Sequence, residues 1–276
     1  MSLSKPHIGC ELKTSELVVK SNRLIEASYR LGLNEQRIIL YAICRAREEQ
    51  KGLFPDLPVT ISAEAFSRQF ALSGEMSNVY RQLREAMDAL FERSVTLHDT
   101  DPETSKARVR RVRWISEASY IDGAGRVQVV FAPEVIKYIT RLEKEFTSYQ
   151  LEKVGRMTSA YAVRLYELLT QYREAGTREL NLAWLRDALQ IEPSEYKLTA
   201  DLKKWVLDVS VEQINKHTDL TVSYKPKKTG RAITDFAFKI KIKDAKPKRQ
   251  ALTDQQLREQ LEARGQQRID DPAEEF

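Results

Sequence analysis

The sequence is poor in residues that form disulfides or hold metal ions. Its only cysteines are Cys10 and Cys44, too few for a disulfide framework. Its only histidines, His7, His98 and His217, are isolated from one another along the chain. Cys44 has no histidine or second cysteine nearby at metal-ligand spacing, and the pair His7 and Cys10 has no further cysteine or histidine near it. We therefore expect no disulfide, no bound metal and no cofactor.

Long apolar runs are also missing. No stretch approaches the roughly 20 apolar residues that cross a bilayer, and residues 1–12 lack the apolar core of a signal peptide. A Gly-x-x-x-x-Gly-Lys-Ser/Thr phosphate loop is absent too, because Lys228-Thr229-Gly230 does not fit that pattern. These absences predict a cytoplasmic protein without membrane contact, with no nucleotide hydrolysis site and no catalytic residues, and thus not an enzyme.

Positive charge is present and is unevenly distributed. The 276 residues are 42% hydrophobic and 31% charged, as in a soluble globular protein of one or two domains. Between Lys197 and Arg249 there are 14 Lys and Arg against 6 Asp and Glu, while the net charge of the whole chain is only +5. Basic charge concentrated in one region predicts contact with phosphate.

The basic region begins with a long helical pattern from Ser194 to Lys216. Apolar residues recur there at three- and four-residue steps and predict one buried face. These are Leu198, Leu202, Trp205, Val206 and Val209. Lys197, Asp201 and Lys204 fall on the polar side. A helix with this cationic face fits the major groove of B-DNA.

A basic hairpin pattern follows the long helix. Leu220 to Tyr224 predicts a short strand, and Lys225 to Arg231 predicts a turn rich in Lys, Pro and Gly. In the next strand Phe236, Phe238, Ile240 and Ile242 alternate with lysines, as a half-buried strand requires. A helix followed by a basic hairpin is the order of a winged helix. The alternative is an ordinary solvated basic face.

The same order of elements occurs twice, about 120 to 125 residues apart. The first copy has helical patterns at 34–47, around Phe66 and Phe70, and at 78–92, with strand patterns at 59–61, 95–98, 108–114 and 126–131. The second copy has helical patterns at 159–174, around Leu185 and Leu189, and at 194–216, with a strand pattern at 179–182. Ser62 predicts an N-cap in the first copy, and the second copy shows no obvious cap. Two tandem winged helices of class α+β are the economical interpretation.

These patterns divide the chain into four parts. We predict an N-terminal arm at 1–15, a first winged-helix domain at 16–135 and a second at 136–243. A helical connector, Pro133 to Lys153, would join the two domains. Residues 244–276 carry eight acidic against six basic residues and few apolar ones, which predicts a flexible charged tail.

Three stretches, taken in order, resemble the replication initiator (Rep) proteins of iteron-carrying plasmids that replicate by the theta mode. The stretches are Val18 to Asn22 through Leu33 to Ala42, then Tyr80 to Ala86 with Leu90 to Ser94, then Tyr196 to Lys216 followed by Leu220 to Gly230. Together they span roughly residues 16–243.

The resemblance implies a protein that binds directly repeated origin sequences. In the family the second domain inserts its long helix into the major groove. The first domain adds contacts in the monomer and forms the dimer interface otherwise. Monomers start replication, whereas dimers repress the protein's own gene, which links binding to copy control. A host initiator and the replicative helicase are expected partners. Lys203-Lys204-Trp205 stands where relatives can carry a run of arginines, and lysine lacks the two-pronged guanidinium fork.

The predicted DNA-binding residues fall into three groups. On the long helix they are Lys197, Thr199, Ala200, Asp201, Lys203 and Lys204. On the hairpin they are Tyr224, Lys225, Lys227, Lys228 and Arg231, expected to hold phosphates. In the first domain they are Arg81, Arg84, Arg108, Arg110, Arg111 and Arg113, although Glu85, Glu92 and Glu103 are close enough in sequence to neutralise some of them.

Two other functions fit parts of the pattern. A rolling-circle nicking enzyme would need a His-hydrophobe-His metal site and a nucleophilic tyrosine, and the isolated histidines make it the weaker alternative. A dedicated transcriptional regulator with two winged helices binds duplex DNA through the same surface, so the fold cannot separate it from an initiator.

Overall fold

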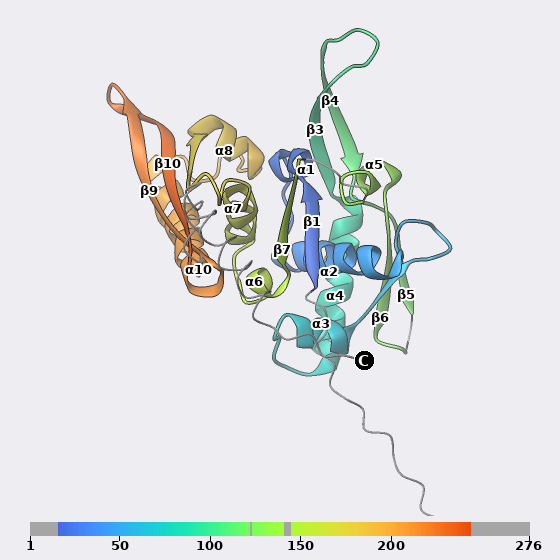
Figure 1. Cartoon of the computed structure of the whole chain (residues 1–276). Coiled ribbons are helices and arrows are strands. Elements are labelled where there is room, and N and C mark those ends of the chain that lie inside the picture. The colour runs from blue at the N-terminus through green and yellow to red at the C-terminus, as the bar shows by residue number, and fades with distance from the viewer. Residues whose placement is uncertain (1–15, 122, 141–144, 244–276) are drawn as a thin grey trace, which may run out of the picture. The chain divides into compact units, whose positions relative to one another are not determined.

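The computed structural model describes residues 16–121, 123–140 and 145–243 (Figure 1). The predicted arm at 1–15 and the predicted tail at 244–276 lie outside these residues. In the described ranges, no helix has both the length and the apolar character needed to span a bilayer.

The N-terminal half contains the first predicted copy of the repeated order. Its elements are α2 (Leu33–Glu49), β2 (Val59–Ser62), α3 (Ala63–Gln69), α4 (Met76–Glu92), β3 (Ser94–Thr100), β4 (Ala107–Arg113), β5 (Ile115–Ile121) and β6 (Arg126–Phe131). Residues Ile38 to Ile43 of α2 are buried, which fits the uncharged helical pattern there. The Ser62 hydroxyl accepts a hydrogen bond from the Ala65 amide at 3.1 Å, so the predicted N-cap is confirmed.

Two sheets form in this half. Strands β2, β6 and β5 make a three-stranded antiparallel sheet, and β3 and β4 make a separate hairpin. Strand β5 was not predicted, because its polar residues dilute the apolar alternation. The hairpin register places Asp99 opposite Arg108, a pairing that the sequence does not reveal.

The C-terminal half repeats the order. Its elements are α7 (Ala160–Thr170), β8 (Thr177–Asn181), α8 (Leu182–Ala188), α9 (Thr199–Leu202), the π-helical segment η1 (Lys203–Asp208), α10 (Val209–His217), β9 (Leu220–Thr229) and β10 (Ala232–Ile242). The expectation of a missing cap is wrong, because the Asn181 side chain accepts hydrogen bonds from the amides of Ala183 and Trp184 at 3.0 and 3.2 Å. Asn181 ends the strand and begins the helix at once, so it looked like part of the strand.

The predicted turn at Lys225 to Arg231 is mostly strand. Strand β9 continues to Thr229, and the connection to β10 is only Gly230 and Arg231. Gly230 has a φ of 63°, which glycine adopts without strain at the first position of a two-residue hairpin loop. Pro226 is tolerated because β9 lies at the edge of the sheet, whose order is β8-β10-β9.

The predicted connector helix, Pro133 to Lys153, is not a single helix. This stretch contains α5 (Pro133–Ile136), β7 (Phe146–Gln150) and α6 (Glu152–Gly155). Strand β7 pairs antiparallel with β1 (Leu17–Ser21), which precedes α1 (Asn22–Glu26). Since β1 and β7 lie about 130 residues apart, only the tertiary fold could select the extended form.

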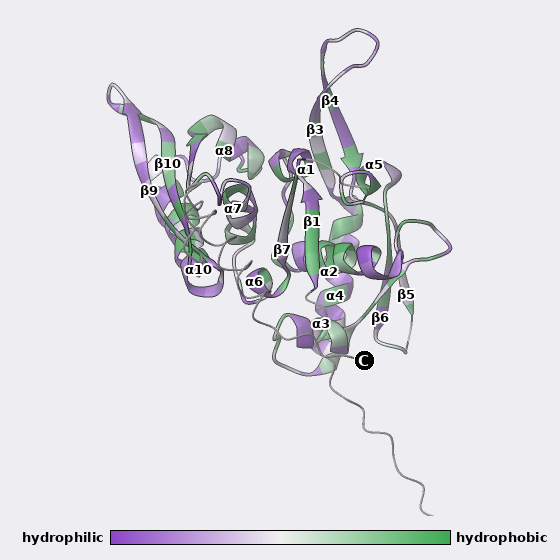
Figure 2. Cartoon of the chain, in the orientation of Figure 1, coloured by the Kyte–Doolittle hydropathy of each residue, from purple (hydrophilic) through white to green (hydrophobic). Residues whose placement is uncertain are grey.

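Hydrophobic and hydrophilic residues both occur along β10, as the hydropathy colouring shows (Figure 2). In β10 the residues Phe236, Phe238 and Ile240 are buried while Lys239 is exposed, so the predicted alternation is confirmed. Strand β10 therefore turns a lysine-bearing face away from the core.

A buried ionic cluster ties β1 and β7 to α7. Its members are Lys20, Tyr29, Tyr149, Arg164 and Glu167. The Glu167 carboxylate accepts hydrogen bonds from Lys20 at 2.7 Å, Tyr149 at 2.6 Å, Arg164 at 3.0 Å and Tyr29 at 3.2 Å. Burial alone would raise the pKa of Glu167, but Lys20 and Arg164 outweigh it and lower the pKa to about 2. The cluster is fully hydrogen-bonded around its carboxylate, as a buried charge requires.

Polar pairs extend this junction from residues 26–30 to the C-terminal half. Arg178 pairs with Glu26 at 2.9 Å, and Arg30 makes a two-pronged contact to Glu195, with both distances 2.8 Å. The Ser28 hydroxyl donates to Asp187 of α8. One short segment of the N-terminal half therefore contacts the second copy of the repeat at three points.

Candidate nucleic-acid interface

The long predicted helix is present from Thr199 to His217 and is here named the reading helix. It comprises α9, η1 and α10, and it starts five residues later than the pattern predicted. Of the predicted contacts, Lys197, Ala200 and Lys204 are exposed, while Thr199, Asp201 and Lys203 are half-buried. The exposed ones gather at the N-terminal end of the helix. Lys197 precedes its first turn.

The predicted apolar face of this helix is only partly correct. Leu202 and Val206 are buried, but the exposed fractions of Leu198 and Trp205 are 65% and 55%. The helix is not a regular α-helix, because η1 inserts a π-helical turn between Lys203 and Asp208. A π-turn holds extra residues and rotates the rest of the helix about its axis, so a 3.6-residue period cannot assign both ends to one face.

The cations of the reading helix lack acidic partners. Within the described ranges, the structure gives no carboxylate in ion-pair distance of Lys197, Lys203 or Lys204. The Lys204 ammonium instead lies 4.4 Å from the centroid of the Trp205 ring. Unpaired lysines keep their full charge for a polyanion.

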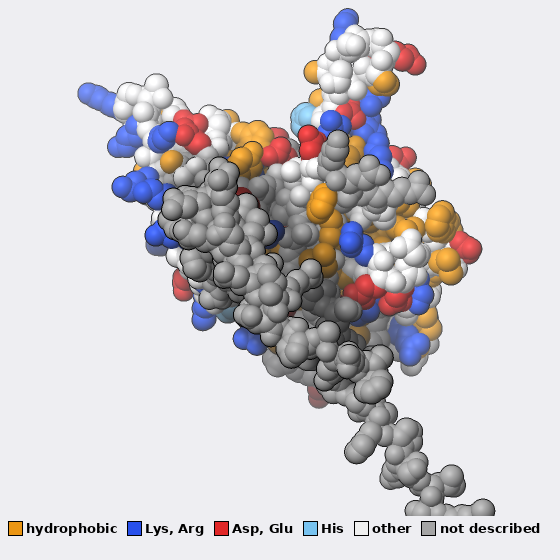
Figure 3. Space-filling model, in the orientation of Figure 1, with side chains coloured by type: hydrophobic (Ala, Val, Ile, Leu, Met, Phe, Trp, Pro, Cys, Tyr) orange, Lys and Arg blue, Asp and Glu red, His pale blue; other side chains and the backbone are white. Residues whose placement is uncertain are grey.

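The β9–β10 hairpin carries the predicted wing residues. Lys225, Lys228 and Arg231 are exposed, and over the part of the chain that is described none of them pairs with a carboxylate. Lys227 does pair, with Glu179 of β8. Figure 3 shows Lys and Arg side chains along this hairpin.

Tyr224 connects the hairpin to the reading helix. Its hydroxyl donates to the Asp208 carboxylate at 2.6 Å, and its ring packs edge-on against Phe236. The pKa of Tyr224 is raised above its usual range, mainly by burial and secondly by the hydrogen bond to Asp208. Although Tyr224 was predicted to contact DNA, its contacts in the structure fix the wing strand to the helix.

The arginines of the N-terminal half are mostly engaged within the chain. The Asp99 carboxylate forms ion pairs with Arg108 at 2.8 Å and with Arg110 at 2.7 Å. The pKa of Asp99 is lowered to about 2, mainly by the hydrogen bond from Arg108, to which Arg110 adds. Arg113 pairs with Glu92 at 2.9 Å, and Arg111 donates to the Ser94 hydroxyl at 2.7 Å.

The two arginines predicted on α4 are also engaged. Arg81 pairs with Glu85 at 3.0 Å, and the Arg84 guanidinium lies 4.8 Å from the centroid of the Tyr120 ring. The predicted neutralisation by Glu85 and Glu92 therefore occurs. Asp99, which the sequence did not suggest, is the principal acceptor for the hairpin arginines.

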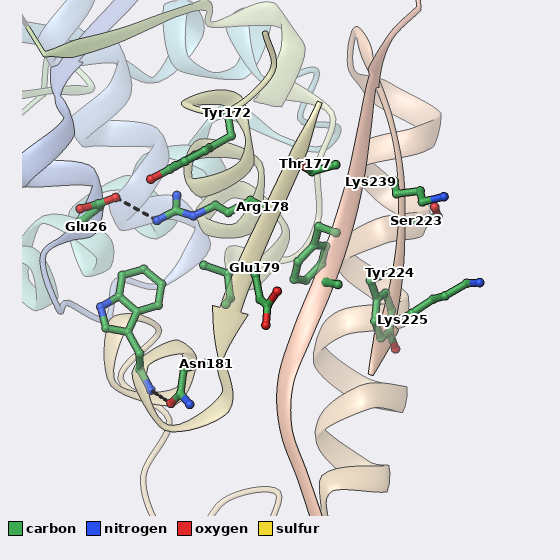
Figure 4. Close-up of a pocket in the computed structure, with 14 residues that line it drawn as sticks. Glu26, Tyr172, Thr177, Arg178, Glu179, Asn181, Ser223, Tyr224, Lys225 and Lys239 are labelled. Carbon is green, nitrogen blue, oxygen red and sulfur yellow. Dashed lines mark hydrogen bonds and ion pairs between the residues drawn. The ribbon is translucent and has the colours of Figure 1, made fainter. Parts of the chain in front are cut away.

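A groove of about 660 Å³ lies at the β8-β10-β9 sheet (Figure 4). Arg178 is held there between the rings of Tyr172 and Trp184, with its guanidinium carbon 4.3 and 5.4 Å from their centroids. Because Arg178 also pairs with Glu26, its donors are committed within the chain. Lys225 and Lys239 line the groove too.

Two parts of the chain match known protein families. Residues 17–170 match the family profile described as Initiator Replication protein, WH1, and residues 181–240 match Initiator Rep protein, WH2. The chain belongs to the initiator replication protein family. The resemblance seen in the sequence and the prediction of two winged helices are thereby confirmed.

Two relatives of this initiator extend over most of its length. An uncharacterized 27.6 kDa protein of Escherichia coli is 25% identical over 231 residues, which are 81% of this chain and 93% of that protein. The crystal structure of the Pi initiator protein in complex with iteron DNA matches with a TM-score of 0.67 and 19% identity, covering 84% of this chain and 100% of the other. At that identity the likeness shows the fold.

Two features of this initiator's interface were not predicted from the sequence. Trp205 is exposed within a π-helical turn, and Lys227 pairs with Glu179 of β8, which is 48 residues away in the chain. The sequence does contain one signal for the π-helical turn. Leu202, Val206, Ser210 and Ile214 follow one another at four-residue steps, which drift around a regular α-helix.

Proposed function

We propose that this chain initiates plasmid replication by binding double-stranded DNA at direct repeats in the origin. The observation that carries the proposal is the reading helix, whose exposed lysines have no carboxylate partner among the described residues and stand beside a lysine-bearing wing. Helices of this shape enter the major groove, and strands that follow them position the protein on phosphates. The Pi initiator, which shares the fold, is seen in complex with iteron DNA.

The two surfaces have separate roles in this proposal. Lys203 and Lys204, with Thr199, Ala200 and Asp201, face base edges and supply specificity. Lys197 and the wing cations Lys225, Lys228 and Arg231 hold phosphates. Lys227 contributes less, because Glu179 already neutralises it.

The first winged helix has an auxiliary role. We place the dimer interface of a monomer–dimer equilibrium in this domain, and we expect the dimer to bind an operator and repress its own gene. Arginines that pair within the chain, such as Arg108 and Arg110, can still meet phosphate only by leaving Asp99. A host initiator and the replicative helicase are the expected protein partners.

A dedicated transcriptional regulator is the second candidate, because it would use the same DNA-binding surface. Propagation separates the two. A plasmid carrying only this gene and its upstream repeats should propagate in a host that offers no other origin. If it is lost while the purified protein still binds the repeats, regulation alone is the function. If the protein binds no duplex above a scrambled control, both candidates fail.

A further inference from the structure

Two large apolar side chains stand exposed at the start of the reading helix, Leu198 directly before it and Trp205 within it. The exposed fractions are 65% for Leu198, at the N-cap, and 55% for Trp205, seven residues later. Leu198 has an extended backbone and precedes the helix, whereas Trp205 lies within η1, so regular α-helical spacing does not place the two side chains on a common face. An exposed indole on this helix, with an exposed leucine directly before its first turn, suggests a surface that binds a partner.

Trp205 lies within the π-helical turn and outside the core. Leu202, Val206, Ser210 and Ile214 are all buried, and they follow one another at four-residue steps. Such steps drift around an α-helix, which repeats every 3.6 residues. The wider turn of η1 compensates for the drift and keeps these four residues in the core. Trp205 is not part of this series and lies outside the core, and π-bulges of this kind are frequent at functional sites.

The surroundings of Trp205 favour a polyanion. The Lys204 ammonium lies 4.4 Å from the indole centroid, and Lys197 precedes Leu198 in the chain. The nearby Asp208 carboxylate already accepts the Tyr224 hydroxyl at 2.6 Å. An apolar patch flanked by unpaired cations fits the DNA major groove, where the 5-methyl group of thymine is the apolar feature among polar base edges.

We propose that Trp205 reads thymine methyl groups in the recognised repeat. The inference rests on the proposed function, since it requires the reading helix to lie in the major groove. Lys204, stacked on the indole, would hold the ring in place and direct its own charge toward a base or phosphate. Trp205 is thus a specificity-determining residue. A lysine side chain alone would not distinguish thymine from uracil, because the two bases differ only in the methyl group.

The test replaces thymine by deoxyuridine, which removes only the methyl group. The probe is a duplex selected from a random-sequence pool by the full-length protein, with thymines replaced one position at a time. We expect one or two positions at which uracil weakens wild-type binding about three- to tenfold. Trp205→Ala should bind the unmodified duplex more weakly by a similar factor and lose its response to uracil at those positions. Trp205→Phe should retain part of the response.

Controls separate this inference from the proposed function. Phe54→Ala removes a side chain of similar exposure, 59%, from the N-terminal half and should leave the uracil response unchanged. Wild-type binding that ignores uracil everywhere, or Trp205→Ala binding that keeps the full uracil response, overturns the inference while duplex binding still stands. Selection that enriches no duplex contradicts the proposed function itself.

Discussion

Two basic regions of this initiator differ in how available their charge is. The β3–β4 hairpin is rich in arginine, yet Asp99, Glu92 and Ser94 each accept hydrogen bonds from these arginines. The reading helix and wing have lysines of which only Lys227 meets a carboxylate in the described residues. Figure 3 shows the difference, with acidic and basic side chains mixed on the β3–β4 hairpin and basic ones prevailing along β9–β10. The number of cations in a segment does not measure the charge that it presents to DNA.

The largest expected effect concerns the buried ionic cluster around Glu167. Glu167→Ala should lower the free energy of unfolding by about 3–5 kcal/mol, because it leaves Lys20 and Arg164 buried without their counter-ion. Denaturant titration followed by circular dichroism measures it. The matched control is Glu85→Ala, whose pair with Arg81 is exposed and should contribute less than about 1 kcal/mol.

The same carboxylate predicts a dependence on acid. The pKa of Glu167 is lowered from 4.5 to about 2 in the folded chain, so its stabilisation is complete above about pH 4.5 and is lost as the pH falls toward 2. Thermal melts of the wild type should therefore lose stability between pH 5 and pH 2.5, and the loss should be smaller in Glu167→Gln. Equal slopes in the two proteins would contradict the assignment.

A smaller effect distinguishes base contacts from phosphate contacts. Lys204→Ala should weaken binding to the selected duplex by about 1–3 kcal/mol while leaving binding to scrambled DNA nearly unchanged. Arg113→Ala, which removes a cation paired with Glu92, should alter neither affinity by more than about twofold. Fluorescence anisotropy at one fixed salt concentration is sufficient. Equal losses for both variants would remove the distinction between the two regions.

Salt dependence sharpens the comparison within the wing. Lys228→Ala should reduce the slope of log affinity against log salt by about one, because it removes one free phosphate-binding cation. Lys227→Ala should reduce it less, since Glu179 already holds that ammonium. Titrations between about 50 and 300 mM salt provide the slopes. A larger change for Lys227 than for Lys228 would show that the Glu179 pair opens on DNA.

The smallest expected effect comes from freeing the paired arginines. Asp99→Asn removes the shared acceptor of Arg108 and Arg110. Binding to scrambled DNA should increase by a few-fold at low salt, with a slightly steeper salt slope. Because the pKa of Asp99 is lowered to about 2, the wild type should show no such gain at any pH between 5 and 8.

Much of the fold was predictable from periodicity, and the exceptions share a cause. Helices α2 and α4 and strand β10 follow from the spacing of their apolar residues, such as Phe236 and Phe238. Strands β1 and β7 do not, because each is extended only through the pairing of Val18 with Tyr149 and its neighbours. Tertiary partners decided the state of these segments.

In the candidate site, too, periodicity predicted some residues and missed others. Lys197, Lys204 and Lys228 are exposed, in agreement with their place on the polar sides of the predicted helix and hairpin. The exposure of Trp205 within a π-turn was not predicted, nor was the pairing of Lys227 with β8 or of Arg110 with β3. No local spacing contains that information, since the acceptors Glu179 and Asp99 lie 48 and 11 residues away.

Methylation interference on the selected duplex tests the central claim most directly. Dimethyl sulfate marks guanine N7, which lies in the major groove, so methylation there blocks a helix seated in that groove. We predict interference at guanines within the repeat for the wild type, and loss of interference at particular guanines for Lys204→Ala. Binding that tolerates methylation at every guanine N7, or an unchanged pattern in Lys204→Ala, would contradict the reading-helix assignment.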